Sequence, residues 1–153
     1  MIEKYSYKGS ENTGFYTLAT NEYVLVPPDH TQADFFDKKI VETKLNRTNL
    51  VGLFAAGNSN CLIVPEEISE IEKERLEESG IEFTVLESNY NALGNLILCN
   101  DKGALISEKI SEYKDEVADA LNVDVKIADI KGLNPGVSGI VNSNGGVIHR
   151  DAS

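Results

Sequence analysis

The sequence is poor in basic residues, and this shortage restricts the partners that the protein can bind. Fourteen lysines and arginines stand against 25 aspartates and glutamates, giving a formal net charge of −11 at pH 7. Lys38 and Lys39 are the only adjacent basic pair. Proteins that grip nucleic acid directly gather basic side chains into a patch or stripe. We therefore expect little direct nucleic-acid contact, whereas basic protein partners are compatible with the charge.

Cysteine and long apolar segments are scarce as well. Only Cys61 and Cys99 are present, and without a secretory signal two cysteines favour free thiols over a disulfide. Met1–Lys8 contains no apolar run of signal-peptide length, and no later stretch approaches the length of a membrane span. The sequence also has no nucleotide-binding loop and no metal-ligand cluster. These shortages predict a soluble, cytoplasmic protein without a cofactor, a metal or a membrane partner.

What the sequence does contain is a repeat. Four segments share a glycine, an apolar run, a polar turn and a second apolar run, and they begin at Gly14, Gly52, Gly94 and Gly136. Successive copies start 38, 42 and 42 residues apart, which is typical of one supersecondary unit copied in a ring or an array. A chain of 153 residues suits a single domain. We expect residues 1–153 to form one domain in which the four glycines are equivalent points about one axis.

Each copy predicts a strand, a hairpin turn and a return strand. The first strands are expected at Leu53–Ala56 and Leu96–Cys99, and the polar turns after them contain Asn, Asp and Gly, which tolerate the positive φ of tight turns. The return strands are apolar in the same columns of every copy, which predicts burial on both faces. They are expected at Cys61–Val64, Ala104–Ile106 and Gly146–Ile148.

A helix and a closing strand complete the unit. Helical patterns cover Glu66–Ser79, with Ile71 on its apolar side, and Ser107–Leu121, behind a Ser cap, while Thr31–Lys39 is a shorter version. Closing strands are expected at Ile40–Leu45, Ile81–Glu87, Val123–Ala128 and, ahead of the first copy, Ile2–Tyr7. Because no hairpin precedes the last of these, it predicts ring closure by the N-terminal segment.

These residues carry a resemblance that runs over essentially the whole chain. The segments Leu50–Gly52, Gly57–Asn60, Ala92–Asn95, Asn100–Ser107 and Gly145–His149 resemble the archaeal and eukaryotic translation initiation factor 6 family. The resemblance implies a pentein-type β/α-propeller, an α/β fold present here as about three repeats and the hairpin of a fourth. It also implies a factor that binds the large ribosomal subunit, helps its maturation and prevents joining of the small subunit.

The same resemblance implies where the ribosome would bind. The residues after the repeat glycines would lie at the ribosome-facing end of the propeller: Phe15, Leu53, Asn95 and Val137. An acidic surface suits basic ribosomal proteins near the sarcin-ricin region, because opposite potentials raise the encounter rate. Asn95 is polar where its column is otherwise apolar. It could contact the partner, or it could only cap a strand end or a loop.

The sequence departs from the family in length. Members carry about five copies of the unit, whereas this sequence stops at Ser153 after three copies and the hairpin of a fourth. Either it belongs to a longer chain, or something else supplies the missing blades. Open sheet edges pair readily with other chains. Self-association through the open ends of the ring is therefore expected if the chain is complete.

An enzyme of the guanidine-modifying branch of the same fold is the alternative function. Such catalysis needs a Cys nucleophile beside a His base and a carboxylate that holds the guanidinium group. Cys61 and Cys99 both fall in apolar strands, where small residues ordinarily pack, and neither is paired by sequence with His30 or His149. No catalytic residue is therefore assigned, and a fast-reacting thiol would be the mark of the enzyme.

One column of turn residues has two interpretations. Asn58, Asn100 and Asn142 occupy equivalent turn positions, so they could form a ligand-binding ring at the axis. Asparagine also satisfies backbone groups of its own turn through its side chain. The second interpretation is favoured, because a ring of uncharged amides makes a poor substrate trap.

Overall fold

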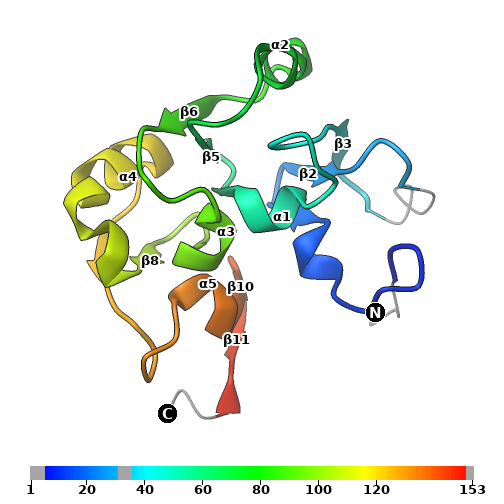
Figure 1. Cartoon of the computed structure of the whole chain (residues 1–153). Coiled ribbons are helices and arrows are strands. Elements are labelled where there is room, and N and C mark those ends of the chain that lie inside the picture. The colour runs from blue at the N-terminus through cyan, green and yellow to red at the C-terminus, as the bar shows by residue number, and fades with distance from the viewer. Residues whose placement is uncertain (1–5, 31–35, 151–153) are drawn as a thin grey trace.

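The computed structural model describes residues 6–30 and 36–150, which form a mixed α/β fold of small sheets and few helices (Figure 1). Three sheets share one strand order, in which a hairpin is followed by a closing strand parallel to its second strand. They comprise β1 (Leu18–Ala19), β2 (Tyr23–Val26) and β3 (Lys39–Glu42); β4 (Ala56–Gly57), β5 (Leu62–Pro65) and β6 (Phe83–Leu86); and β7 (Ile97–Cys99), β8 (Ala104–Ile106) and β9 (Val125–Ile127). The fourth is the hairpin of β10 (Gly139–Asn142) and β11 (Gly145–Ile148).

A short helix precedes each hairpin and contains the repeat glycine. These helices are η1 (Thr13–Phe15), α1 (Val51–Phe54), α3 (Leu93–Leu96) and α5 (Pro135–Ser138). The prediction of strand from Leu53 and from Leu96 was therefore wrong, because Leu53 lies within α1, Leu96 ends α3, and the strands begin only at Ala56 and Ile97. Successive short helices contact one another, and α1, α3 and α5 follow in order through the centre of Figure 1.

The repeat glycines pack backbone against backbone. A Cβ atom added to Gly94 would lie 2.0 Å from the carbonyl oxygen of Gly52, and the same distance separates Gly52 from the Gly14 carbonyl and Gly136 from that of Gly94. No side chain fits at such a distance, so glycine is required for the close approach of each helix to the one before it. Of the four repeat glycines, only Gly14 has no described atom within 4 Å of where its Cβ would be.

The outer helix of the second unit is fixed by a capping box. Helix α2 (Glu70–Ser79) begins after Ser69, whose side chain accepts from the Glu72 N–H, while the buried Glu72 carboxylate accepts from the Ser69 N–H at 2.7 Å. Glu72 also accepts from the Arg47 N–H at 2.7 Å, which joins the helix to the preceding turn. The predicted start at Glu66 was therefore too early, and Ile71 is 67% exposed instead of buried.

The other helical predictions also need correction. Instead of one helix over Ser107–Leu121, the chain forms the 3₁₀ helix η3 (Glu108–Tyr113) and then α4 (Lys114–Leu121). The backbone turns out of helical geometry at Ile110, whose side chain is fully buried in the core. The helix expected at Thr31–Lys39 lies mainly outside the described residues, and its last residue already belongs to β3.

Burial of the return strands differs among the units. Strands β2 and β5 are buried along their whole length, as predicted, and β8 nearly so, but β11 is exposed at all four residues. The core consists of two clusters. The first joins β2, β5, α1 and α2, and the second joins β5, β8, α3 and α4. Each cluster lies between successive units, so a return strand is buried only when another unit packs beyond it.

The closing strands are shorter than expected. Strand β9, for example, covers three residues of the predicted Val123–Ala128. Of the N-terminal strand predicted at Ile2–Tyr7, residues 2–5 lie outside the described residues, and Tyr7 pairs with Ser10 in an isolated bridge. That bridge spans Lys8 and Gly9, which both have positive φ, so a tight turn leads the chain into the first unit.

Replacing Gly94 by alanine should destabilise the protein, because its new methyl group would overlap the Gly52 carbonyl. We expect the free energy of unfolding to fall by about 2–3 kcal/mol, measured by urea denaturation with circular dichroism. Gly14→Ala is the matched control, since the same column position there has open space, and it should change stability by less than about 0.5 kcal/mol. Equal losses for the two variants would contradict the packing argument.

Candidate functional site

The short helices present a shared surface at one end of the molecule. Three residues that follow repeat glycines line the mouth of one hollow: Phe15, Asn95 and Val137. Phe15 is 44% exposed and Val137 is 58% exposed. Leu53 is half-buried and packs partly against the first core cluster. The structure thus brings three of the four expected partner-binding residues to one opening, with Leu53 on the neighbouring helix α1.

Asn95 differs chemically from the others in this column. Its backbone N–H donates to the Ala92 carbonyl within the helix turn, but among the described residues its side-chain amide has no hydrogen-bond partner. The amide therefore does not cap a strand end or a loop of the described structure. A half-buried amide whose donors and acceptor are not used internally can bind an external polar group.

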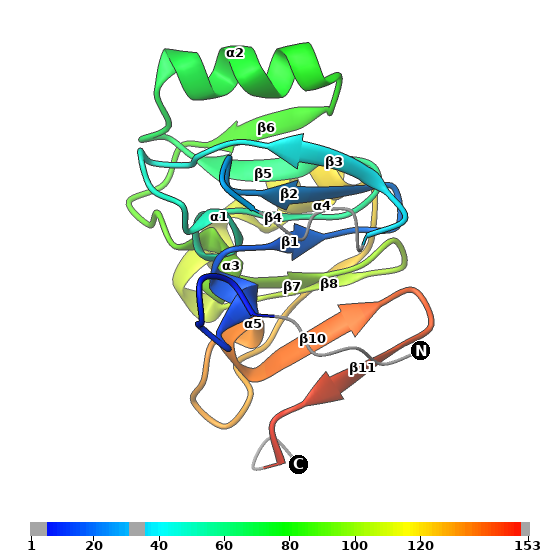
Figure 2. The ribbon, with the colours of Figure 1, turned by 90° about the vertical axis from the view of Figure 1, so that its right-hand side faces the viewer.

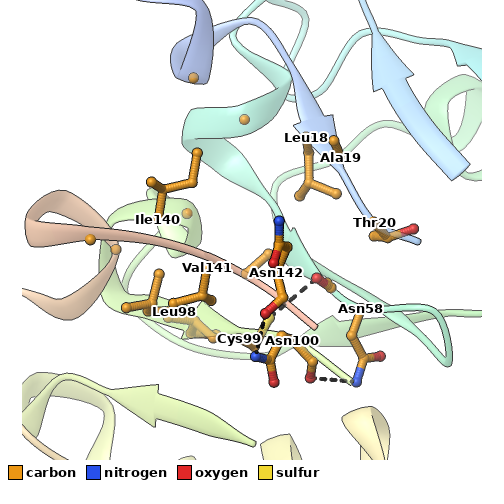
Figure 3. Close-up of a pocket in the computed structure, with 18 of the residues that line it drawn as sticks. Leu18, Ala19, Thr20, Asn58, Leu98, Cys99, Asn100, Ile140, Val141 and Asn142 are labelled. Carbon is orange, nitrogen blue, oxygen red and sulfur yellow. Dashed lines mark hydrogen bonds between the residues drawn. The ribbon is translucent and has the colours of Figure 1, made fainter. Parts of the chain in front are cut away.

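The hollow continues from the short helices to the hairpin turns as a channel of about 1270 Å³ (Figure 3). The first strands of all four hairpins line it, and they contribute small and apolar residues such as Ala19, Ala56, Leu98 and Val141. Polar side chains gather where these strands reach their turns. The channel therefore has an apolar wall and one polar end.

The asparagine column lies at that polar end and links successive units. Asn100 Oδ1 accepts from the Lys102 and Gly103 N–H groups of its own turn, while Nδ2 donates to the Asn142 carbonyl at 3.0 Å. Asn58 repeats the arrangement, with Nδ2 donating to the Asn100 carbonyl (Figure 3). These amides close their own turns and join neighbouring turns, which occupies the atoms that a ligand would need.

Thr20 belongs to the same column, and the sequence analysis missed it. Its hydroxyl oxygen accepts from the Glu22 and Tyr23 N–H groups, in the way that the asparagine Oδ1 atoms accept in the other copies. The position could have been found by counting from Gly14, because Thr20 and Asn58 lie the same distance after their repeat glycines.

The next column converges on Asp101, which the sequence analysis also missed. The Asp101 carboxylate accepts from the Ser59 N–H at 2.8 Å, the Ser59 hydroxyl at 2.9 Å, the Ser143 hydroxyl at 3.3 Å and the Asn21 amide. These partners come from the other three copies. Partial burial alone would raise the pKa of Asp101, but the hydrogen bonds from Ser59, Asn21 and Ser143 hold it below its usual value.

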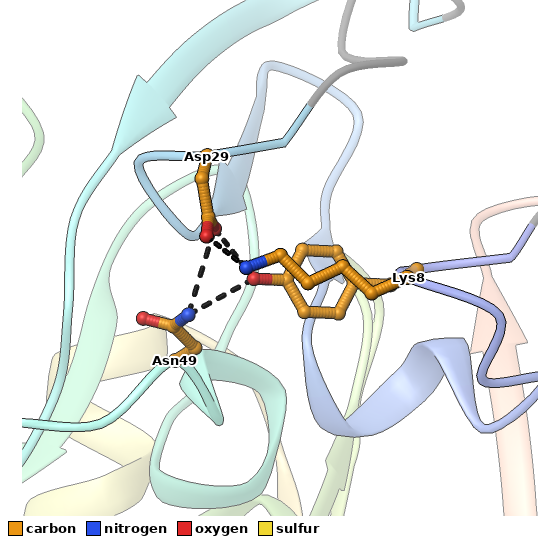
Figure 4. A network of polar contacts seen from close by, with 4 residues as sticks. Lys8, Asp29 and Asn49 are labelled. Atoms are coloured by element: carbon orange, nitrogen blue, oxygen red, sulfur yellow. Dashed lines mark hydrogen bonds and ion pairs between the residues drawn. The ribbon is translucent and has the colours of Figure 1, made fainter.

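A second polar network ties the first turn to the rest of the molecule (Figure 4). Asp29 accepts from the Tyr7 hydroxyl and forms an ion pair with Lys8, and Asn49 donates to the Tyr7 oxygen at 2.9 Å. Hydrogen bonds from Lys8 and Tyr7 lower the pKa of Asp29. His30 stacks on Tyr7 at 5.9 Å between ring centroids, and burial lowers its pKa.

The two thiols lie in surroundings that suppress reactivity. Cys99 donates to the Gly57 carbonyl at 3.2 Å, and burial raises its pKa to about 12. Burial likewise raises the pKa of Cys61. In the part of the chain that the structure describes, neither thiol hydrogen-bonds to a histidine. A nucleophilic cysteine needs the opposite, a partly exposed thiol with a lowered pKa.

Residues 6–30 and 36–150 contain neither a metal-ion site nor a membrane-spanning helix. No group of three or more His, Cys, Asp or Glu side chains there is arranged to hold a metal ion. No helix there is long and apolar enough to cross a membrane.

These features define a class of α/β proteins in which similar units surround a channel and expose a row of short helices. The sequence matches the profile of the eIF-6 family over residues 2–153, and the chain belongs to that family.

Curated relatives named translation initiation factor 6 are identical to the chain at about a third of the aligned positions. The protein from Pyrococcus abyssi is 34% identical over 166 residues, covering 99% of this chain and 73% of the relative. The Staphylothermus marinus protein is 34% identical, with 99% and 72% covered. The Methanocaldococcus jannaschii protein is 32% identical, with 97% and 71% covered.

Asp101→Asn should change how stability depends on pH. The lowered pKa of Asp101 means that its carboxylate stabilises the folded state above about pH 4, and that this contribution disappears as the pH falls below that value. We expect the variant to be less stable than the parent by about 1 kcal/mol at pH 7, with the difference shrinking between about pH 4 and pH 2.

Urea denaturation at several pH values measures this difference. The control is Asp119→Asn, at an exposed position on α4, for which we expect less than about 0.5 kcal/mol at every pH. A difference for Asp101→Asn that stays constant from pH 7 to pH 2 would refute the role of its carboxylate.

Native Cys61 and Cys99 should react slowly with a disulfide reagent, since burial raises the pKa of both thiols. We expect rates at pH 7.5 at least about 100-fold below those of the same thiols in urea. The release of thionitrobenzoate gives the rates, and single Cys→Ser variants assign them. A native thiol that reacts faster than the unfolded one would revive the cysteine-enzyme hypothesis.

Proposed function

We propose that the protein is a translation initiation factor that binds the large ribosomal subunit and sterically prevents its association with the small subunit. A role in maturation of the large subunit belongs to the same proposal. Membership of the eIF-6 family and the names of the relatives support it. The proposed action is steric, takes place in the cytoplasm and needs neither catalysis nor a cofactor.

We further propose that the fold is a pentein-type propeller, in which residues 1–153 form one domain. The repeated strand order of three sheets and the identical 2.0 Å approach of successive repeat glycines support equivalent units about one axis. Copies that are held this closely cannot shift independently. A rigid body of this kind suits a factor that works by excluding another large particle.

The observation that carries the functional proposal is the row of short helices around the channel mouth. It exposes Phe15 and Val137 and offers the Asn95 amide, which has no hydrogen-bond partner among the described residues. Large apolar side chains beside an available polar group are typical of the centre of a protein interface. Leu53 extends the proposed contact on α1.

The charge of the chain favours one kind of contact on the ribosome. A formal net charge of −11 opposes approach to the RNA phosphates and favours basic ribosomal proteins. We propose that the partners are basic proteins near the sarcin-ricin region, with little direct nucleic-acid contact. Binding should accordingly weaken as the salt concentration rises.

Charge placed on the short-helix face should weaken ribosome binding. We expect Val137→Glu to reduce binding to isolated archaeal large subunits at least about tenfold, because a carboxylate would be buried against the partner. Asn95→Ser should cost a smaller factor, since it shortens a polar side chain without adding charge. Co-sedimentation over a range of protein concentrations measures both losses.

Ile71→Glu is the matched control for Val137→Glu, because Ile71 is also an exposed apolar residue but lies on the outer helix α2. Its binding should equal that of the parent. Parental binding by both Val137→Glu and Asn95→Ser would reject this face as the docking surface. The absence of any binding by the parent protein would reject the function itself.

A further inference from the structure

The turn of the fourth hairpin contains the only Asn-Gly pair in the sequence, Asn144 and Gly145. Asparagine is a chemically labile residue, and a following glycine increases the lability because it has no Cβ to hinder attack on the asparagine side chain. Both residues of the pair are exposed. Figure 2 shows their turn on the same side of the molecule as the turn between β7 and β8.

The exposure of Asn144 belongs to its position in the turn. The equivalent residues of the other hairpins are Glu22, Asn60 and Lys102, and each of them is exposed as well. The β4–β5 and β7–β8 hairpins each contact the first strand of the next unit, yet their turn residues remain at the surface. Asn144 is therefore accessible to solvent whether or not a unit packs beyond it.

The reacting groups of the pair are held differently. Within the part of the chain that the structure describes, the Asn144 side-chain amide forms no hydrogen bond, so it can rotate toward the next backbone nitrogen. That nitrogen is restrained, because the Gly145 N–H donates to Asn142 Oδ1 at 3.0 Å. The Asn144 N–H donates to the same oxygen at 2.9 Å. Attack by the Gly145 nitrogen requires that its bond to Asn142 break first.

We propose that Asn144 is a site of spontaneous deamidation whose rate is held down by the Asn142 side chain. The Gly145 nitrogen forms a bond to Asn144 Cγ as the bond from Cγ to Nδ2 breaks, and the Gly145 proton passes to the leaving nitrogen. Ammonia leaves and a succinimide remains. Water then opens the succinimide at one of its two carbonyl carbons, which gives aspartate or isoaspartate. This inference does not depend on the proposed ribosomal function.

The modification would loosen the contacts of this turn with the preceding unit. Isoaspartate adds a methylene group to the backbone of a two-residue loop, so the pairing of Asn142 with Gly145 cannot keep its register. The Ser143 carbonyl in the same loop accepts from Lys102 Nζ at 2.7 Å, and the Ser143 hydroxyl donates to Asp101 at 3.3 Å. Deamidation therefore acts on the polar end of the channel, where the turns of the copies meet.

Peptide mass spectrometry of the folded protein, incubated at mildly alkaline pH, tests the proposal. We expect the mass gain of deamidation at Asn144 and not at Asn60, which has the same turn position but is followed by Cys61. Asn142→Ala should speed the reaction about fivefold, the factor that loss of one typical hydrogen bond produces. Asn142→Thr is the matched control and should keep the parental rate, because the Thr20 hydroxyl accepts from the equivalent turn N–H groups in the first copy.

Gly145→Ala separates the chemistry from a change in folding. An added Cβ there meets no described atom within 4 Å, so the variant should give the circular dichroism of the parent and lose most of the modification. The parent in urea should react faster than the folded parent, since the turn no longer restrains Gly145. Modification of the folded parent at Asn144 no faster than at Asn60 would overturn the proposal. Equal rates for the folded parent and the parent in urea would overturn the restraint by Asn142, as would equal rates for the parent and a folded Asn142→Ala variant.

Discussion

The rest of the structure depends on one contact, the approach of each repeat glycine to the carbonyl of the preceding one. A Cβ atom added to Gly52, Gly94 or Gly136 would lie only 2.0 Å from the carbonyl oxygen of the preceding repeat glycine. This close approach fixes how tightly neighbouring units pack. The core clusters lie between those units, so their packing follows from the same approach. The distance also sets the spacing of the short helices, and with it the separation of the residues on the proposed docking face.

The hairpin turns form the second point at which the units meet. There the contacts are hydrogen bonds instead of close packing: asparagine amides join neighbouring turns, and Asp101 receives donors from three other copies. Two sets of contacts at opposite ends of a channel resist tilting of one unit against the next. A surface built on such units keeps its shape, which favours binding with little loss of conformational entropy.

The repeat made much of this architecture predictable, because equivalent columns adopt equivalent structures. The return strands and the order of elements follow from apolar columns in the sequence, as at Leu62–Pro65. The short helices were missed, since Val51–Phe54 has the apolar composition of a strand and is helical through its tertiary contacts. Asp101 was missed for a related reason. Its importance comes from partners more than 40 residues away, which no local pattern reveals.

The fourth hairpin shows that a residue's position in the repeat does not by itself determine whether its side chain is buried. Val147 and Ile63 share a column and an apolar side chain, yet one is exposed and the other is fully buried. The difference lies in the neighbours, because Ile63 has the β7–β8–β9 unit packed beyond it and a parallel strand at its edge. An apolar residue at such a repeat position therefore favours contact with the next unit, and it is buried only where that contact is made. Where the described residues provide no next unit, the same column is exposed, as at Val147.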